Sequence, residues 1–144
     1  MTLEEYMLEW AKDAPIPKEK LDEAARNVPY LHAKWWRYLT EAKLRLKKLN
    51  LEYKVLYKNK VEWYGDKMVD SDREALGWER NARKILPTQI GTYIDADKDV
   101  QAIQRQVALA DETVNFLIDV IKSINNRGYL IHTTVDYLRF SMGT

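Results

Sequence analysis

The chain has 144 residues, a net charge of +1 and no cysteine. Its apolar fraction of 46% is that of a folded domain, and the lack of cysteine excludes disulfide scaffolds, thiolate catalysis and cysteine-based zinc sites. The acidic N-terminal stretch and the lack of an eighteen-residue apolar run argue against a secretory signal and a membrane span. We therefore expect a soluble, intracellular protein.

Several short elements are expected outside the central part of the chain. Thr2 and Glu5 stand at capping-box spacing and predict a short helix that ends before Pro15, and a second short helix is expected over 18–27. Ser71 and Glu74 repeat this spacing and predict a helix that ends before Pro87. The stretch TQIGTYI, residues 88–94, has the β-branched and aromatic content of an extended segment, which favours a small β element there.

Two long helices dominate the prediction. Neither glycine nor proline occurs between Pro29 and Gly65, so a helix is expected over about 29–64, and a second is expected over about 95–126 with Asp95 as its cap. Both carry a heptad pattern, in which spacings of three and four alternate. The heptad positions are His32, Trp35, Leu39, Ala42, Leu46, Leu49, Tyr53, Leu56, Lys60 and Trp63 in the first helix, and Val100, Ile103, Val107, Ala110, Val114, Leu117, Ile121 and Ile124 in the second. The predicted fold is mainly α, as a helical hairpin, an oligomeric coiled coil or both.

A short C-terminal helix is expected after Gly128, with apolar residues around most of its circumference. Such a terminal helix needs a partner, and self-association is the simplest one. The residues expected at this contact are Tyr129, Leu130, Ile131, Val135, Leu138 and Phe140.

The sequence contains no pattern that indicates catalysis or metal binding. Asp95, Asp97 and Asp99 resemble the start of a calcium loop, but Val100 and Gln106 occupy the positions that require glycine and glutamate. There is no phosphate-cradling glycine loop, and the two histidines lie a hundred positions apart. We expect neither an enzyme nor a cofactor nor a metal site.

Positive charge gathers in one stretch. Ten basic and four acidic residues lie between Lys34 and Lys67, so this stretch carries +6 and the rest of the chain −5. On a helix, Lys47, Lys54 and Lys58 share one side, with Tyr57 beside them. Proteins that bind single-stranded nucleic acid combine such cations with aromatic side chains on which bases stack. A solvated lysine face over an aromatic core gives the same pattern, so both interpretations stay open at this point.

Three stretches resemble the UvsY family, the recombination mediators of T-even-type bacteriophages. They are KWWRYLTEAKLRLKKLNLEYKVLYKNKVEWY at 34–64, ADKDV at 96–100 and IKSINNRGYLIHTTVDYLRFSMG at 121–143. The resemblance implies a protein without catalysis that binds single-stranded DNA. It also implies loading of a UvsX-type recombinase onto strands coated by the phage single-stranded DNA-binding protein, in recombination and in recombination-dependent replication and repair. A homo-oligomeric ring of six or seven subunits, held by the C-terminal region, would act in the cytoplasm of the infected bacterial host.

The resemblance also points to residues. A basic pair that supports strand binding in the family falls on Lys58 and Lys60, and the family pattern has arginine at the second position. Lys60 keeps the charge but lacks the planar fork of arginine, which indicates a phosphate contact. The residues expected to contact DNA are Arg45, Lys47, Lys48, Lys54, Tyr57, Lys58, Lys60 and Lys67.

These expectations divide the chain into a DNA-binding region, 1–94, and a helical oligomerisation region, 95–144. The alternative is a structural coiled-coil assembly protein, a virion or scaffold component, whose lysines only keep the helix soluble.

Overall fold

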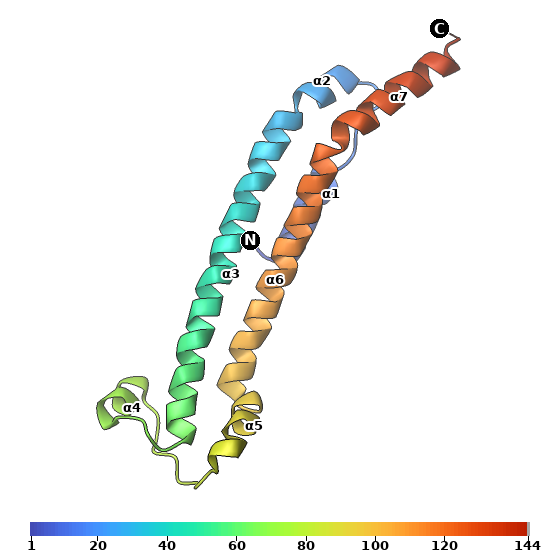
Figure 1. The fold of residues 1–144 in the computed structure, drawn as a ribbon. Coiled ribbons are helices and arrows are strands. Elements are labelled where there is room, and N and C mark those ends of the chain that lie inside the picture. Colours follow the sequence, from blue (N-terminus) through green and yellow to red (C-terminus); the bar gives the residue numbers. More distant parts are fainter. Residues whose placement is uncertain (144) are drawn as a thin grey trace. The chain divides into compact units, whose positions relative to one another are not determined.

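The computed structural model describes residues 1–143, which form helices and connecting loops without a β-strand (Figure 1). The helices are α1 (Leu3–Asp13), α2 (Leu21–Arg26), α3 (Val28–Tyr64), α4 (Asp70–Leu76), α5 (Ile90–Asp95), α6 (Lys98–Asn125) and α7 (Arg127–Ser141), with a 3-10 turn η1 (Pro87–Gln89) before α5. The prediction of a mainly α fold is confirmed. No helix within residues 1–143 combines the length and the apolar character needed to cross a membrane.

The two long helices lie close to their predicted bounds, but the cap of the second one differs. Asp97 rather than Asp95 caps α6, because its Oδ1 accepts hydrogen bonds from the backbone N–H of Asp99 at 2.9 Å and of Val100 at 3.1 Å. These are two of the four N–H groups that a helix start leaves without a partner. The predicted cap was therefore two residues too early.

The expected β element at 88–94 is wrong. These residues form most of η1 and all but the last residue of α5, and Pro87 opens η1 in a position where its missing N–H costs nothing. Ile90 and Ile94 stand one helical turn apart, and Ile94 is fully buried. Burial of this isoleucine in helical spacing outweighs the weak β preference of the stretch.

The capping boxes had opposite outcomes. At α1 the box is present, since Thr2 Oγ1 accepts from Glu5 N at 3.2 Å and Glu5 Oε2 accepts from Thr2 N at 2.8 Å. At α4 it is absent, because Val69 occupies the cap position, two residues before the expected Ser71. This helix ends at Leu76 and not near Pro87, and its C-cap Gly77 has a φ of 69°, in the left-handed region.

The chain divides into two compact units, and each long helix contributes to both. Unit 1 comprises Met1–Leu44 together with the chain from Leu109 onward, and its core contains fully buried Trp35. The Trp10 ring meets Trp35 edge to face at 5.5 Å, and Lys34 Nζ binds Glu9 and Asp13 of α1, each at 2.7 Å. These contacts fix α1 against the first turns of α3.

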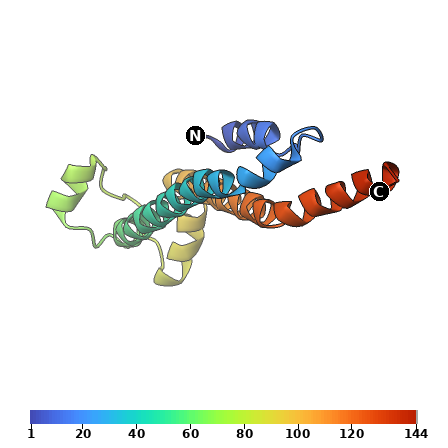
Figure 2. The same ribbon diagram turned by 90° about the horizontal axis from the view of Figure 1, so that it is seen from above.

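Unit 2, Arg45–Ala108, holds the second half of α3 and the first turns of α6 in antiparallel order. Tyr53 Oη accepts a 3.4 Å hydrogen bond from Gln104, and Lys60, further along α3, binds Asp99, which lies earlier on α6. Figure 2 shows α4 beyond the end of α3 and α5 at the start of α6, on a different side. The division into functional regions 1–94 and 95–144 stays a prediction, and every residue expected to contact DNA lies in unit 2.

Candidate nucleic-acid interface

Three lysines follow one another on the exposed side of α3, and we call Lys47, Lys54 and Lys58 the α3 lysine face. All three are exposed, and Arg45 and Lys48 are exposed beside them. Among residues 1–143 only Lys58 of these five cations meets a carboxylate, that of Glu62 at 3.7 Å. An exposed pair of this kind contributes little to stability, and the Lys58 side chain stays 74% exposed. The charges of this face are therefore available to an anionic partner.

Aromatic and apolar side chains stand among these cations. Tyr57 is 39% exposed, and its ring centroid lies 6.0 Å from that of Tyr53. Leu51 and Val55 are more exposed still, on the side of α3 that points away from the core. Neither Leu51 nor Val55 was among the residues expected at the interface, although both are apolar residues outside the heptad positions. The exposed side of α3 thus offers both charge and apolar surface.

Lys60 does not belong to this face. Each residue turns an α-helix by about 100°, so Lys58 and Lys60 point in nearly opposite directions. Lys60 is 6% exposed, and its Nζ lies 2.9 Å from Asp99 Oδ2 and 3.1 Å from Asp97 Oδ2. It also lies 4.3 Å from the centroid of the Trp78 ring. Lys60 was expected to contact a phosphate, but two carboxylates and an indole ring already surround its ammonium group. Its place in the heptad seam agrees with this position.

Asp97 is the centre of an arrangement that we call the Lys60 cluster: Lys60, Tyr64, Trp78, Asp97 and Asp99, of which Lys60 and Asp97 are buried. Burial alone would raise the pKa of Asp97, but hydrogen bonds from Tyr64, from the Val100 N–H and from Lys60 outweigh it and hold the pKa below its usual value. The Tyr64 hydroxyl donates to Asp97 Oδ2 at 2.6 Å, and burial followed by this bond raises the pKa of Tyr64. The cluster therefore holds a charged aspartate that joins the end of α3 to the start of α6.

Gly65, Asp66 and Lys67 form the turn that follows α3. The N–H of Lys67 donates to Glu62 O at 2.8 Å, and Asp66 has a φ of 53°, the left-handed conformation that closes many helices. Arg80 binds Asp66 through two hydrogen bonds of 3.1 and 3.2 Å, and they lower the pKa of this carboxyl. Lys67 is exposed just beyond the helix, so it lies near the α3 lysine face in sequence but outside the helix itself.

The residues expected at a subunit contact differ in how exposed they are. On α7, Tyr129 and Leu130 are exposed and Phe140 is 84% exposed, whereas Val135 and Leu138 are half-buried. Ile131 is buried within unit 1, where α7 packs against α2. Arg127 anchors the start of α7 by donating to the carbonyl oxygens of Ala14 at 2.9 Å and Pro15 at 3.0 Å. Of the expected contact residues, the aromatic ones, Tyr129 and Phe140, are therefore exposed on α7.

Within residues 1–143 no three histidine or acidic side chains gather in a way that could hold a metal ion. Asp97 and Asp99 both bind Lys60. The single Lys60 ammonium therefore compensates part of their charge.

Comparison with known proteins shows the family of the chain. The family model described as "Recombination, repair and ssDNA binding protein UvsY" matches residues 9–144. The chain is 24% identical to the recombination protein uvsY of Enterobacteria phage T4 over 143 residues, which cover 99% of both proteins.

It also resembles crystal structures of the bacteriophage T4 recombination mediator protein UvsY. The lattice type II structure has a TM-score of 0.84 and 25% identity over 99% of this chain and 98% of that one. The lattice type IV structure has a TM-score of 0.79 and 24% identity over 98% and 99%. A mainly helical chain with exposed cations along α3, matched over nearly its whole length, belongs to the UvsY family of recombination, repair and single-stranded-DNA-binding proteins.

Proposed function

We propose that this chain binds single-stranded DNA through the α3 lysine face, together with Arg45, Lys48, Tyr57 and Lys67. The observation that carries the proposal is the row of exposed lysines on one side of α3, of which only Lys58 meets a carboxylate within residues 1–143. Cations in a row suit the phosphates of an extended strand, and neighbouring aromatic faces suit its unpaired bases. Family membership supports single-stranded DNA as the ligand.

The cellular role that we propose is that of a phage recombination mediator. The protein would hold a strand coated by the phage single-stranded DNA-binding protein and promote loading of a UvsX-type recombinase onto it. The similarity to the T4 recombination mediator supports this role. The row of cations suits the work, because contacts to phosphates hold a strand without selecting its sequence.

We further propose a homo-oligomeric ring of six or seven subunits, assembled through the exposed side chains of α7. A single lysine face binds weakly, but subunits that engage the same strand at once raise the overall affinity by orders of magnitude. Tyr129 and Phe140 are the proposed anchors, because large aromatic residues carry much of the binding energy in protein interfaces. Ile131 supports the contact indirectly, through the packing of α7 within unit 1.

One experiment tests binding and assembly together. The variant Tyr129→Ser with Phe140→Ser is expected to have a smaller mass in solution than the wild type. It should keep weak, salt-sensitive binding to single-stranded DNA and lose tight binding. Tyr30→Ser is the matched control, because Tyr30 is about as exposed as Tyr129 but lies on α3. Analytical ultracentrifugation gives the mass, and fluorescence anisotropy gives the affinity at several salt concentrations.

Two outcomes of this experiment would count against the proposal. A wild-type oligomer without salt-sensitive binding to single strands would favour the structural assembly protein. Unchanged mass in the double variant would remove α7 from the subunit contact, whatever its effect on DNA.

A further inference from the structure

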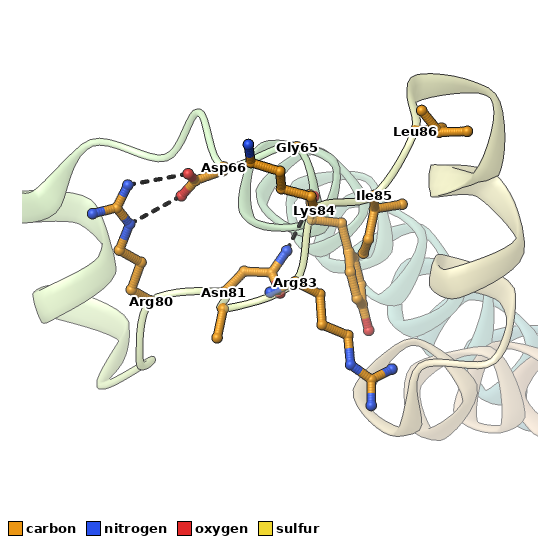
Figure 3. Close-up of a pocket in the computed structure, with 10 residues that line it drawn as sticks. Gly65, Asp66, Arg80, Asn81, Arg83, Lys84, Ile85 and Leu86 are labelled. Carbon is orange, nitrogen blue, oxygen red and sulfur yellow. Dashed lines mark hydrogen bonds and ion pairs between the residues drawn. The ribbon is translucent and has the colours of Figure 1, made fainter.

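A pocket of about 550 Å³ lies beside the end of α3 and inside unit 2 (Figure 3). Its walls are Tyr64, Gly65 and Asp66 on one side and the loop 80–86 on the other. Pockets that hold small ligands have volumes of about 300–1,000 Å³, so this one has room for a nucleotide. A helix was expected up to Pro87, but the structure has no helix between Gly77 and Leu86, so the prediction is wrong for this loop.

The rim of the pocket is positively charged. Asp66 is compensated by Arg80 through two hydrogen bonds, so neither group adds net charge. Arg83 and Lys84 are exposed, and neither meets a carboxylate among residues 1–143. Figure 3 shows their side chains leaving the loop in opposite directions. Two cations that point apart can each bind one of two successive phosphates of a nucleic acid. They are less suited to bind a single phosphate together.

The loop is held in place before any ligand binds. Asn81 donates from Nδ2 to the carbonyl oxygen of Tyr64 at 3.1 Å and accepts from the Arg83 N–H at 3.2 Å. The Trp63 indole N–H donates to the carbonyl oxygen of Glu79 at 2.6 Å. A binding loop that is already ordered loses less conformational entropy when it binds.

The pocket also has apolar walls. Ile85 and Leu86 line it from the loop, and Tyr64 lines it from α3. The Tyr64 hydroxyl is occupied by Asp97, which fixes the ring. A fixed ring beside aliphatic side chains is a surface against which a base can pack.

We propose that this pocket takes one nucleotide of the bound single strand, with its base against Tyr64 and Ile85 and its flanking phosphates on Arg83 and Lys84. The inference rests on the proposed single-strand binding and extends it from α3 to the loop 80–86. Tyr64 follows Lys58 by six residues, or roughly 9 Å along the helix, so one strand can reach both. A single strand has regularly spaced phosphates for the two cations and flat bases for the apolar wall of the pocket. An acidic peptide would match the cations alone.

The test compares the variant Arg83→Ala with Lys84→Ala against the control Lys18→Ala with Lys20→Ala in the full chain. The control removes the same charge from exposed residues of unit 1. Each phosphate contact contributes about 0.7 to the slope of log affinity against log salt for a single strand. The loop variant is therefore expected to lose about 1.4 from the slope for each engaged subunit, which is about 25-fold in affinity near 0.1 M salt. The control should keep the wild-type slope.

A second measurement locates the base. Oligonucleotides that contain 5-iodo-deoxyuridine are irradiated in complex with the wild-type protein, and cross-linked peptides are identified by mass spectrometry. We expect a cross-link to Tyr64 or to the segment 82–86. Loss of this cross-link in the loop variant, but not in the control, would support binding of a nucleotide in the pocket.

An unchanged slope together with no cross-link in this segment would overturn the inference and leave binding at the α3 lysine face intact. A loop variant that keeps its DNA slope but no longer binds the recombinase would assign the pocket to an acidic protein partner, which also overturns it. Loss of salt-sensitive binding in the wild type would instead contradict the proposed function itself.

Discussion

Replacing Lys54 and Lys58 together by alanine is expected to weaken binding of single-stranded DNA by about 25-fold for each engaged subunit near 0.1 M salt. Two lost phosphate contacts lower the slope of log affinity against log salt by about 1.4, and this change sets the size of the effect. Both side chains are exposed, and alanine favours helix formation at least as much as lysine. The loss should therefore come from the interface and not from unfolding of α3.

The salt slope and the thermal midpoint are measured on the same samples, with Lys18→Ala and Lys20→Ala as the charge-matched control. Lys58→Ala also removes the contact to Glu62, but an exposed pair of this kind contributes only about 0–1 kcal/mol. If the slope of the Lys54 and Lys58 variant equals that of the wild type, the α3 lysine face serves only to keep the helix soluble. The structural assembly protein would then be the better interpretation.

Replacing Lys60 by methionine is expected to lower the free energy of unfolding by about 3 kcal/mol, because breaking a buried pair leaves an uncompensated charge. The Lys60 and Asp97 side chains are each 8% exposed, so water cannot replace the lost partner easily. Methionine keeps most of the length of the side chain, which limits the loss of packing. Urea unfolding measures the change, and Lys58→Met on the exposed side of α3 is the matched control, with an expected change within about 0.5 kcal/mol.

The same variant separates two roles for Lys60. A positioning residue lowers stability when it is removed and leaves the salt slope of the folded protein nearly unchanged. A direct phosphate contact would do the reverse, with a loss of about 0.7 in the slope and little loss of stability. The second pattern would show that the Lys60 cluster opens to admit DNA, against the arrangement in the structure.

The long helices could be predicted because their signals are local. The absence of glycine and proline from Tyr30 to Tyr64 and the spacing of apolar residues need no knowledge of the fold. The segment 88–94 had too few residues for a period to distinguish strand from helix, and the burial of Ile94 decided the outcome. That burial depends on tertiary packing, which residue preferences do not contain.

The candidate site could be predicted only where it depends on spacing within one helix. Spacing alone placed Lys47, Lys54 and Lys58 on one side of α3, and the structure exposes all three. The partners of Lys60 could not be found this way, since Asp99 lies 39 positions along the chain. The pocket beside Tyr64 is also formed by a loop without regular structure, and hydrogen bonds from Asn81 and Trp63 define its path.

The most direct measurement is acetylation of lysines in the wild-type protein with and without saturating single-stranded DNA, followed by mass spectrometry. DNA should lower the reactivity of Lys47, Lys54 and Lys58 and leave that of exposed Lys12 and Lys18 unchanged. Buried Lys60 should react slowly in both states. Equal reactivity of Lys54 and Lys58 with and without saturating DNA would contradict binding at the α3 lysine face.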